Sequence, residues 1–348
     1  MFASLGFESL SPLTASLYLA LGLGAAFGVL AEITRFCLRR AVVGKDAQAR
    51  GTWAMALAVA IIGTQAAVFS GLISFEGHRF LAADLPILAL VLGGLAFGIG
   101  MVLTRGCASR LAVLAGSGNL RAVTVLIVFA VIAHATLKGV FAPLAQALAS
   151  VTLPIGGALP LTAGAAIALI ALALAFRARI GALQLTLAAL IGLLVPAAWV
   201  GTGFILFDDF DPIAMESLSL TAPATATLFW TVAGTSIAPG FGVGLVGGVL
   251  AGALVSALAF GRFAWVSFES PRQTGRYIAG AALMGAGGVL AGGCTLGAGL
   301  SGVPTLGIAA LVAITSIIAG AALAGRLLNE SASGSAEQPS TRGLQPAE

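Results

Sequence analysis

Long apolar segments alternate with short polar loops along most of this chain. A helix needs about 20 mainly apolar residues to cross the hydrocarbon core of a bilayer. Segments of this kind lie at approximately 13–31, 52–74, 86–104, 122–138, 160–176, 181–200, 239–260, 276–292 and 305–324. The pattern therefore predicts an all-α polytopic membrane protein with about nine transmembrane helices.

Other apolar stretches are too short to cross the bilayer. They cover about 33–43, 107–117, 223–236 and 294–303, next to glycine or proline or directly after a full span. We expect four short re-entrant helices, since irregular backbone at membrane depth persists only where protein or a water-filled cavity covers it. Such segments favour a conduction path over a simple anchor. The polar segment 329–348 has no periodicity and is expected to be a disordered tail.

An internal repeat relates the two halves of the chain. GIGMVLTRGC, at Gly98–Cys107, matches GAGGVLAGGC, at Gly285–Cys294, in six of ten positions with an offset of 187 residues. The same offset moves the second, third and fourth spans onto the last three. We therefore expect a first repeat at 1–158, a linking transmembrane helix at 159–180 and a second repeat at 181–328. One linking span inverts the second repeat, as in many secondary transporters.

Composition and charge support a membrane location. Hydrophobic residues make up 59% of the 348 and charged residues 9%, whereas soluble domains carry about a quarter charged residues. The net charge of +4 is no nucleic-acid signal, because the basic residues concentrate in the loops that follow odd-numbered spans. By the positive-inside rule, the N-terminus is expected outside and the C-terminus in the cytoplasm.

Three cysteines, Cys37, Cys107 and Cys294, carry the candidate chemistry. Their odd number and the lack of a CxxC pair disfavour a disulfide framework or a zinc site. We expect no metal and no cofactor. The sequence also lacks GxxxxGK[ST], so this chain alone is not expected to use ATP.

Glycines precede two of the cysteines. We expect Gly106 and Gly293 to mark backbone turns that let a substrate approach. The first N–H groups of the short helix behind each turn would then attract an anion, with Thr295 and Ser301 as further donors. Arg105 either attracts the anion at the inner mouth or only sets the orientation. As a weak, soft donor, a thiol suits a polarizable sulfur atom. In the simpler interpretation each cysteine is only a small apolar helix residue.

Other polar residues leave two interpretations open. Glu32 and Arg35 share one helical face at the inner end of the first span, where an interfacial ion pair is favoured over a functional one. His134 and Lys138 share a face of the fourth span and either line the path or lie at the interface. Gln65 either bonds a neighbouring helix or lines the path.

The cysteine motifs resemble those of the YeeE/YedE-type sulfur transport family. The resemblance covers about 13–326 and rests on GMVLTRGCAS (Gly100–Ser109), AGGCTLGAGLSG (Ala291–Gly302) and the weaker RFCLRRA (Arg35–Ala41). It implies nine spans, four extra short helices and two inverted halves. The family often has AGGC where this chain reads TRGC, so Arg105 replaces a small residue, which bears on the choice of sulfur or selenium species.

The resemblance implies a transporter, not an enzyme, for thiosulfate or a similar small sulfur-containing anion. It also implies a location in the inner membrane of a bacterial cell. It also implies that Cys37, Cys107 and Cys294 relay the ion by thiol hydrogen bonds. The expected partners are this anion, the lipid bilayer and a cytoplasmic sulfur-carrier protein. The alternatives are a membrane thiol oxidoreductase or sulfurtransferase that holds a persulfide, and a structural subunit of a larger importer.

Overall fold

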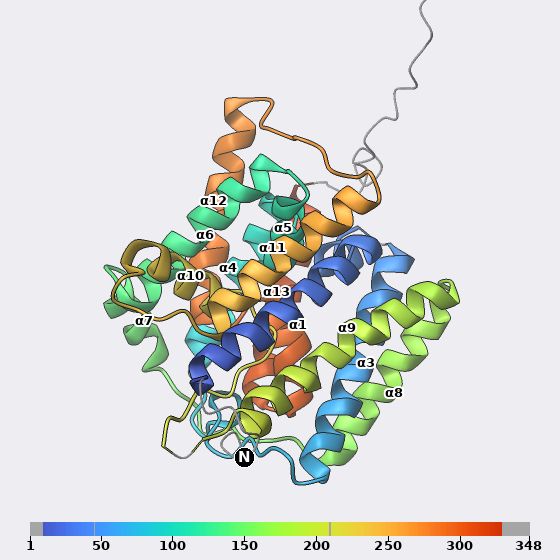
Figure 1. Cartoon of the computed structure of the whole chain (residues 1–348), viewed down its shortest axis with the longest axis vertical. Helices are drawn as coiled ribbons and strands as arrows, with labels where there is room; N and C mark the ends of the chain where they lie inside the picture. Colours follow the sequence, from blue (N-terminus) through green and yellow to red (C-terminus); the bar gives the residue numbers. More distant parts are fainter. Residues whose placement is uncertain (1–9, 45, 209, 329–348) are drawn as a thin grey trace, which may run out of the picture.

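The computed structural model describes residues 10–44, 46–208 and 210–328, and within them only helices, turns and isolated bridges occur (Figure 1). The long helices are α1 (Pro12–Thr34), α3 (Ala47–Phe69), α4 (Ile87–Leu103), α6 (Leu120–Lys138), α8 (Leu161–Arg177), α9 (Ala182–Val200), α11 (Phe241–Ala259), α12 (Pro271–Leu290) and α13 (Ile308–Leu327). The predicted all-α class is confirmed. The predicted tail at 329–348 lies outside the described residues.

Shorter helices connect or follow the long ones. They are α2 (Leu38–Val42), α5 (Ala108–Gly116), α7 (Ala142–Ala149), α10 (Thr221–Ala233), the 3₁₀ turns η2 (Arg79–Leu81) and η5 (Val303–Thr305), and the π-helices η3 (Gly201–Ile205) and η4 (Thr295–Gly302). The four short stretches expected from the sequence correspond to α2, α5, α10 and η4. The sequence did not predict α7, which has no buried residue.

Eight helical segments of the described part are long and apolar enough to cross a membrane. The remaining expected span, at 160–176, corresponds to α8, which has 17 residues. That length is at the lower limit for a transmembrane helix. α4 also has 17 residues, but its apolar segment continues through α5 to Gly116, whereas that of α8 does not continue. The chain is therefore a multi-pass membrane protein.

Side-chain caps fix where several spans begin. Ser11 accepts a hydrogen bond from the Thr14 N–H at the start of α1, where proline occupies the first turn. Ser270 caps α12 in the same way, again before a proline. A serine side chain satisfies one of the free N–H groups of a helix start, and proline at the first position has no N–H group to satisfy.

Glycines bring the backbones of neighbouring spans into contact. A Cβ atom added to Gly24 of α1 would lie 2.5 Å from the Leu245 carbonyl oxygen of α11. One added to Gly100 of α4 would lie 2.5 Å from the Gly280 oxygen of α12. Small residues at helix contacts are the usual means of close packing in membranes, and many of the 47 glycines of the chain serve this purpose.

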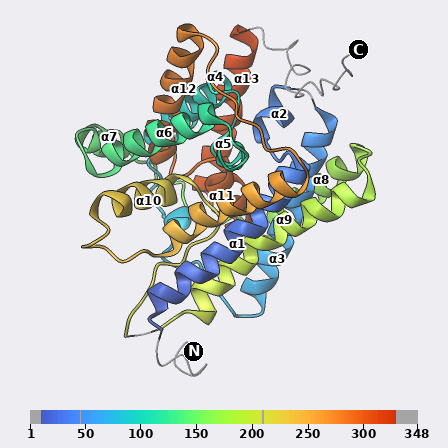
Figure 2. The same ribbon diagram turned by 45° about the horizontal axis from the view of Figure 1, so that its top comes forward.

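The long helices pack in definite pairs. α1 packs against α11, α3 against α8 and α9, α4 against α12 and α13, and α6 against α12. Figure 1 shows α3, α8 and α9 as one group, and Figure 2 shows α4, α12 and α13 together on another side of the molecule. The short helices α2, α5 and η4 lie between these groups and carry the cysteines at their N-terminal ends.

Candidate functional site

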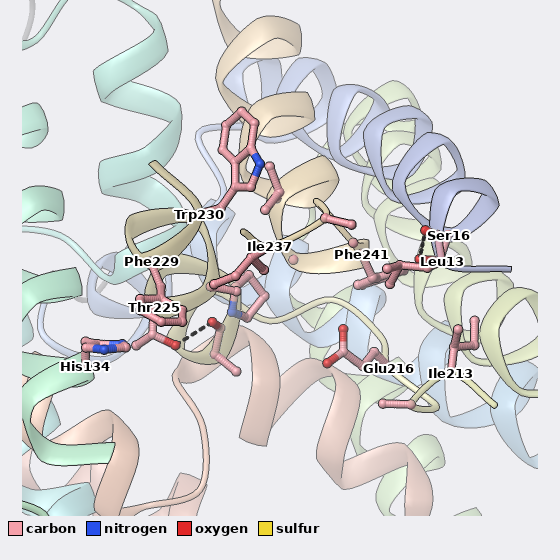
Figure 3. A pocket seen from close by; sticks show the side chains of 18 of the residues that line it. Leu13, Ser16, His134, Ile213, Glu216, Thr225, Phe229, Trp230, Ile237 and Phe241 are labelled. Carbon is pink, nitrogen blue, oxygen red and sulfur yellow. Dashed lines mark hydrogen bonds between the residues drawn. The ribbon is translucent and has the colours of Figure 1, made fainter. Parts of the chain in front are cut away.

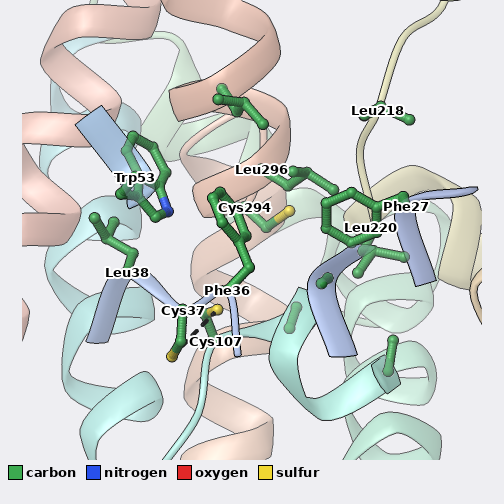
Figure 4. Packing of buried hydrophobic residues seen from close by; sticks show 14 of the residues in the cluster. Phe27, Phe36, Cys37, Leu38, Trp53, Cys107, Leu218, Leu220, Cys294 and Leu296 are labelled. Atoms are coloured by element: carbon green, nitrogen blue, oxygen red, sulfur yellow. Dashed lines mark hydrogen bonds between the residues drawn. The ribbon is translucent and has the colours of Figure 1, made fainter. Parts of the chain in front are cut away.

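Two of the three cysteines are in contact. Cys37 precedes α2 and Cys107 precedes α5, and their Sγ atoms lie 3.9 Å apart, with Cys107 donating (Figure 4). The Cys107 Sγ atom also lies 3.2 Å from the Ser109 hydroxyl oxygen. Both cysteines are 2% exposed or less. The two thiols and one hydroxyl therefore form a short buried chain of hydrogen-bonding groups.

The same backbone turn precedes each cysteine. Arg35, Arg105 and Gly292 have φ angles of 53°, 59° and 68° and stand two positions before Cys37, Cys107 and Cys294. The residue after each arginine donates its N–H to the carbonyl five positions earlier in the preceding helix. This is the Schellman arrangement that ends a helix through one left-handed residue.

The prediction that Gly106 and Gly293 form the turns is therefore wrong by one residue. Close backbone packing explains Gly293 but not Gly106. A Cβ atom at Gly293 would lie 2.9 Å from the Ala298 amide nitrogen, so glycine lets the first turn of η4 approach. A Cβ atom at Gly106 would lie 3.3 Å from the Leu111 side chain and 3.8 Å from that of Arg110, and both are side-chain contacts.

Arg35 and Arg105 are exposed, although the cysteines after them are buried. A residue with a side chain adopts this conformation at a cost of about 1–2 kcal/mol. Because Cys37 and Cys107 touch, the arginine turns also lie near each other. Arg35 and Arg105 therefore stand at two neighbouring helix ends, each two residues before one of the buried thiols.

Cys294 stands at the start of η4. Its Sγ atom accepts a hydrogen bond from the Gly297 N–H at 3.5 Å, and the residue is fully buried. The sequence predicted amide groups free to bind an anion here, but the cysteine sulfur already occupies one of them. Thr295 is buried at the start of the same helix, and the Ser301 hydroxyl donates to the Leu218 carbonyl at 2.7 Å.

An aromatic group separates the cysteines. In the view of Figure 4, the Phe36 ring lies between Cys294 and the Cys37–Cys107 pair. This ring stacks on Trp53, with ring centroids 5.9 Å apart, and meets Phe27 edge-on at 6.0 Å. All three cysteines belong to one buried cluster, so the structure has a closed arrangement around them.

A cavity of about 360 Å³ reaches η4 from the loops. We call it the Arg79 cavity. Its lining includes Arg79, Trp199, Glu216, Ser219, Gly297 and Ser301. The Trp199 Nε1 and Ser219 Oγ atoms are buried without a hydrogen-bond partner, and Trp199 is 3% exposed. Buried donors without acceptors are costly, so they favour a ligand that accepts hydrogen bonds.

The lining of the Arg79 cavity contains one guanidinium, that of Arg79, and one carboxyl group, that of Glu216. The ion pairs among the described residues do not include Arg79, whose guanidinium lies 4.9 Å from the Phe80 ring centroid. Burial, reinforced by Arg79, lowers the pKa of His78 to about 4. The histidine is thus neutral near pH 7, and Arg79 supplies the positive charge.

Other predicted polar contacts are settled by the structure. Glu32 does not pair with Arg35; its carboxylate accepts from Arg262 Nη1 at 3.0 Å and from the Ser256 hydroxyl at 2.9 Å. Gln65 donates to the Pro304 carbonyl at 2.7 Å, so it bonds a neighbouring segment.

Sequence reasoning missed Arg79, Trp199 and Ser219. One signal was present: Arg79 is a basic residue in a loop that otherwise holds Glu76 and Asp84, on the side expected to lack positive charge. The positive-inside rule does not require an arginine there. Nothing in the sequence linked Trp199 and Ser219 to that loop.

Comparison with known proteins identifies the family of this chain. The chain matches the family described as sulphur transport over residues 33–323, a region that contains all three cysteines. It is 26% identical over 303 residues to the thiosulfate transporter TsuA of Escherichia coli (strain K12), which covers 80% of this chain and 84% of that protein. Both matches are transport proteins, in agreement with the prediction of a transporter and not an enzyme. The chain belongs to the sulphur transport (YeeE/YedE) family.

Proposed function

We propose that the chain takes up thiosulfate, or a similar small sulfur-containing anion, across the inner membrane of a bacterial cell. The observation that carries this proposal is the buried contact between the Cys37 and Cys107 thiols. Two thiols from helices far apart in sequence give a soft, weakly donating site, which suits a polarizable sulfur atom better than water or chloride. The similarity to the E. coli thiosulfate transporter supports the same substrate.

The proposed path begins in the Arg79 cavity. There, Arg79 and the unpartnered donors of Trp199 and Ser219 hold the oxygen atoms of the anion. A divalent anion is prohibitively costly in hydrocarbon, so each stage must offer donors or positive charge. From the cavity the ion passes η4 and Cys294 when the aromatic cluster around Phe36 opens.

The inner half of the path is the thiol pair. Cys107 and Cys37 hand the ion on by S–H···S hydrogen bonds, with the thiols protonated, because thiolates would repel an anion. Arg35 and Arg105 then attract the ion at the exit. Gly293 contributes by close packing, since it lets η4 approach the turn, and Gly106 leaves room for the Leu111 side chain.

The proposed architecture is two inverted repeats, 1–158 and 181–328, joined by a linking helix at 159–180. Helix packing supports it. The expected correspondence relates α1 to α9, α3 to α11, α4 to α12 and α6 to α13. The contact of α1 with α11 then has its counterpart in that of α3 with α9, and the contact of α4 with α13 has its counterpart in that of α6 with α12. With this plan the N-terminus is outside and the C-terminus in the cytoplasm, where a sulfur-carrier protein would accept sulfur from the transported anion.

The test is uptake of radiolabelled thiosulfate by liposomes that contain only the purified chain. We expect Cys107→Ser and Cys294→Ser to lose most of the rate. A matched control is Ser117→Ala, since that hydroxyl only bonds the Val113 carbonyl within the end of α5. Wild-type rates in both cysteine variants would exclude the relay. An inactive wild-type chain would favour a structural subunit, and a persulfide on any cysteine after exposure to thiosulfate would favour a sulfurtransferase.

A further inference from the structure

Glu216 lies between two cavities and lines both of them. One is the Arg79 cavity. The other, of about 410 Å³, is bordered by α6, α10 and the N-terminal ends of α1 and α11; we call it the His134 cavity. Figure 3 shows the Glu216 carboxylate pointing into the His134 cavity, with His134 on its far side. A single carboxyl group thus faces the space through which an anion would approach.

The backbone of Glu216 is held while its carboxylate is not. The Thr202 hydroxyl in η3 accepts from the Glu216 N–H at 3.1 Å and donates to the Glu216 carbonyl at 2.8 Å. No hydrogen bond or ion pair engages the Glu216 carboxylate within the described part of the chain. Half-buried carboxylates are normally paired, so this group is placed for a change of state.

Cationic or titratable groups surround Glu216 on both sides. In the Arg79 cavity they are His78 and Arg79, and in the His134 cavity they are His134 on α6 and Lys138 at its C-terminal end. Glu216 is the acid in either lining. Arg79 is within electrostatic range of Glu216 but does not form an ion pair with it.

In this arrangement the Glu216 carboxylate and a bound anion compete for the positive charge of Arg79. As an ionised group, Glu216 repels a sulfur oxyanion and shares the positive field of Arg79 with it. As a protonated group, it repels nothing, offers an O–H donor and leaves Arg79 to the ligand. Burial raises the pKa of Glu216, and Arg79 opposes this only partly, so protonation occurs at a higher pH than for an ordinary glutamate.

We propose that Glu216 takes up one proton from the outer solution when a sulfur oxyanion binds in the Arg79 cavity, so that anion binding and protonation are coupled. The proposal rests on the proposed function and adds its dependence on protons. The step is Glu216–COO⁻ plus H⁺ giving Glu216–COOH, with no covalent bond to the anion. Because the two events are linked, each favours the other, and the affinity for the anion rises as pH falls through the pKa of Glu216.

The test measures thiosulfate binding to the purified full chain in lipid nanodiscs from about pH 5 to about pH 8, together with the protons taken up. With one coupled proton, affinity changes by up to about tenfold per pH unit above the carboxyl pKa. We expect Glu216→Gln, which is neutral at every pH, to bind at high pH as tightly as the wild type does at low pH and to take up no proton. Asp211→Asn is the matched control, since Asp211 is exposed in the same segment and lines neither cavity; it should titrate like the wild type.

Three results would overturn the coupling. One is a Glu216→Gln variant with wild-type pH dependence, and another is a His134→Gln or His78→Gln variant that alone abolishes it. The third needs no variant: a wild-type chain that binds thiosulfate without proton uptake across this range. In these cases thiosulfate uptake by the wild type would leave the proposed function intact, whereas a wild type that neither binds nor transports thiosulfate would end both proposals.

Discussion

The Sγ atoms of Cys37 and Cys107 lie 3.9 Å apart although 70 positions separate the residues in sequence. The contact forms between the residues that precede two short helices, since Cys37 is the N-cap of α2 and Cys107 that of α5. A disulfide requires the sulfur atoms to approach to about 2.0 Å. Both thiols are free, and bond formation would draw the two sulfur atoms closer by about 1.9 Å from their present 3.9 Å.

Oxidation should therefore join Cys37 to Cys107. With a diazene oxidant such as diamide, which is reduced to the hydrazine as the thiols lose two electrons and two protons, we expect loss of two alkylatable thiols and loss of uptake. A thiol reductant should restore both. Peptide mapping identifies the pair, and Cys294→Ser should crosslink like the wild type. A disulfide to Cys294 would contradict the Cys37–Cys107 contact. So would a diamide-treated chain that has lost uptake but still has three alkylatable thiols.

Replacement of Arg105 should separate stability from transport. Arg105→Gly removes the strain of a side chain on left-handed backbone, so we expect the free energy of unfolding to rise by up to about 1 kcal/mol. The same change removes a positive charge at the exit and should lower uptake roughly threefold at low salt, with a smaller effect at high salt. Arg105→Lys, which keeps both the charge and the strain, is the control. Unchanged uptake in Arg105→Gly would mean that the arginine only sets orientation.

The Phe36 ring should limit which ions pass. Phe36→Ala removes a stacked ring from the closed cluster, and we expect a destabilisation of about 3–5 kcal/mol together with measurable uptake of sulfate. Phe129→Ala, another fully buried phenylalanine, should be similarly destabilised yet still exclude sulfate. Liposome uptake with both anions makes the comparison. A Phe36→Ala chain as selective as the wild type would locate the constriction elsewhere.

Trp199 should contribute to anion affinity through its free indole N–H. Trp199→Phe keeps a ring against Phe75, which it meets edge-on at 5.1 Å, but removes the donor. Because a hydrogen bond to a charged group contributes about 1.5–3 kcal/mol, we expect at least a tenfold rise in KM with little change in kcat. Trp265→Phe, at an exposed position, serves as the control, and an unchanged KM in Trp199→Phe would remove this donor from the site.

Hydropathy was sufficient to predict the spans because the bilayer sets a single strong requirement for each of them. Even the short helices followed from the same rule: an apolar stretch of about ten residues such as Ala108–Gly116 must be covered by the rest of the protein. The cysteines were found because glycine motifs repeat around two of them. These features depend on neighbours along the chain, so the sequence contains them directly.

The remaining features depend on neighbours in space. Spacing along one helix predicted that Glu32 pairs with Arg35, but the carboxylate bonds Arg262 and Ser256 from the far part of the chain. Glycine preference predicted turns at Gly106 and Gly293, while the chain uses Arg105 and Gly292. The Arg79 cavity escaped prediction because separate loops and helix ends assemble it, and none of them has a motif.

The glycine contacts between spans have a mechanical consequence. Where the Leu21 carbonyl of α1 would lie 2.3 Å from a Cβ at Gly248, and the Gly93 carbonyl of α4 2.6 Å from one at Gly287, main chains touch with no side chains between them to repack. Helices joined by such contacts cannot slide or tilt against each other without a backbone clash. We therefore expect the helical frame to stay still during each passage while a few rings swing aside, so that the solute travels through a stationary scaffold.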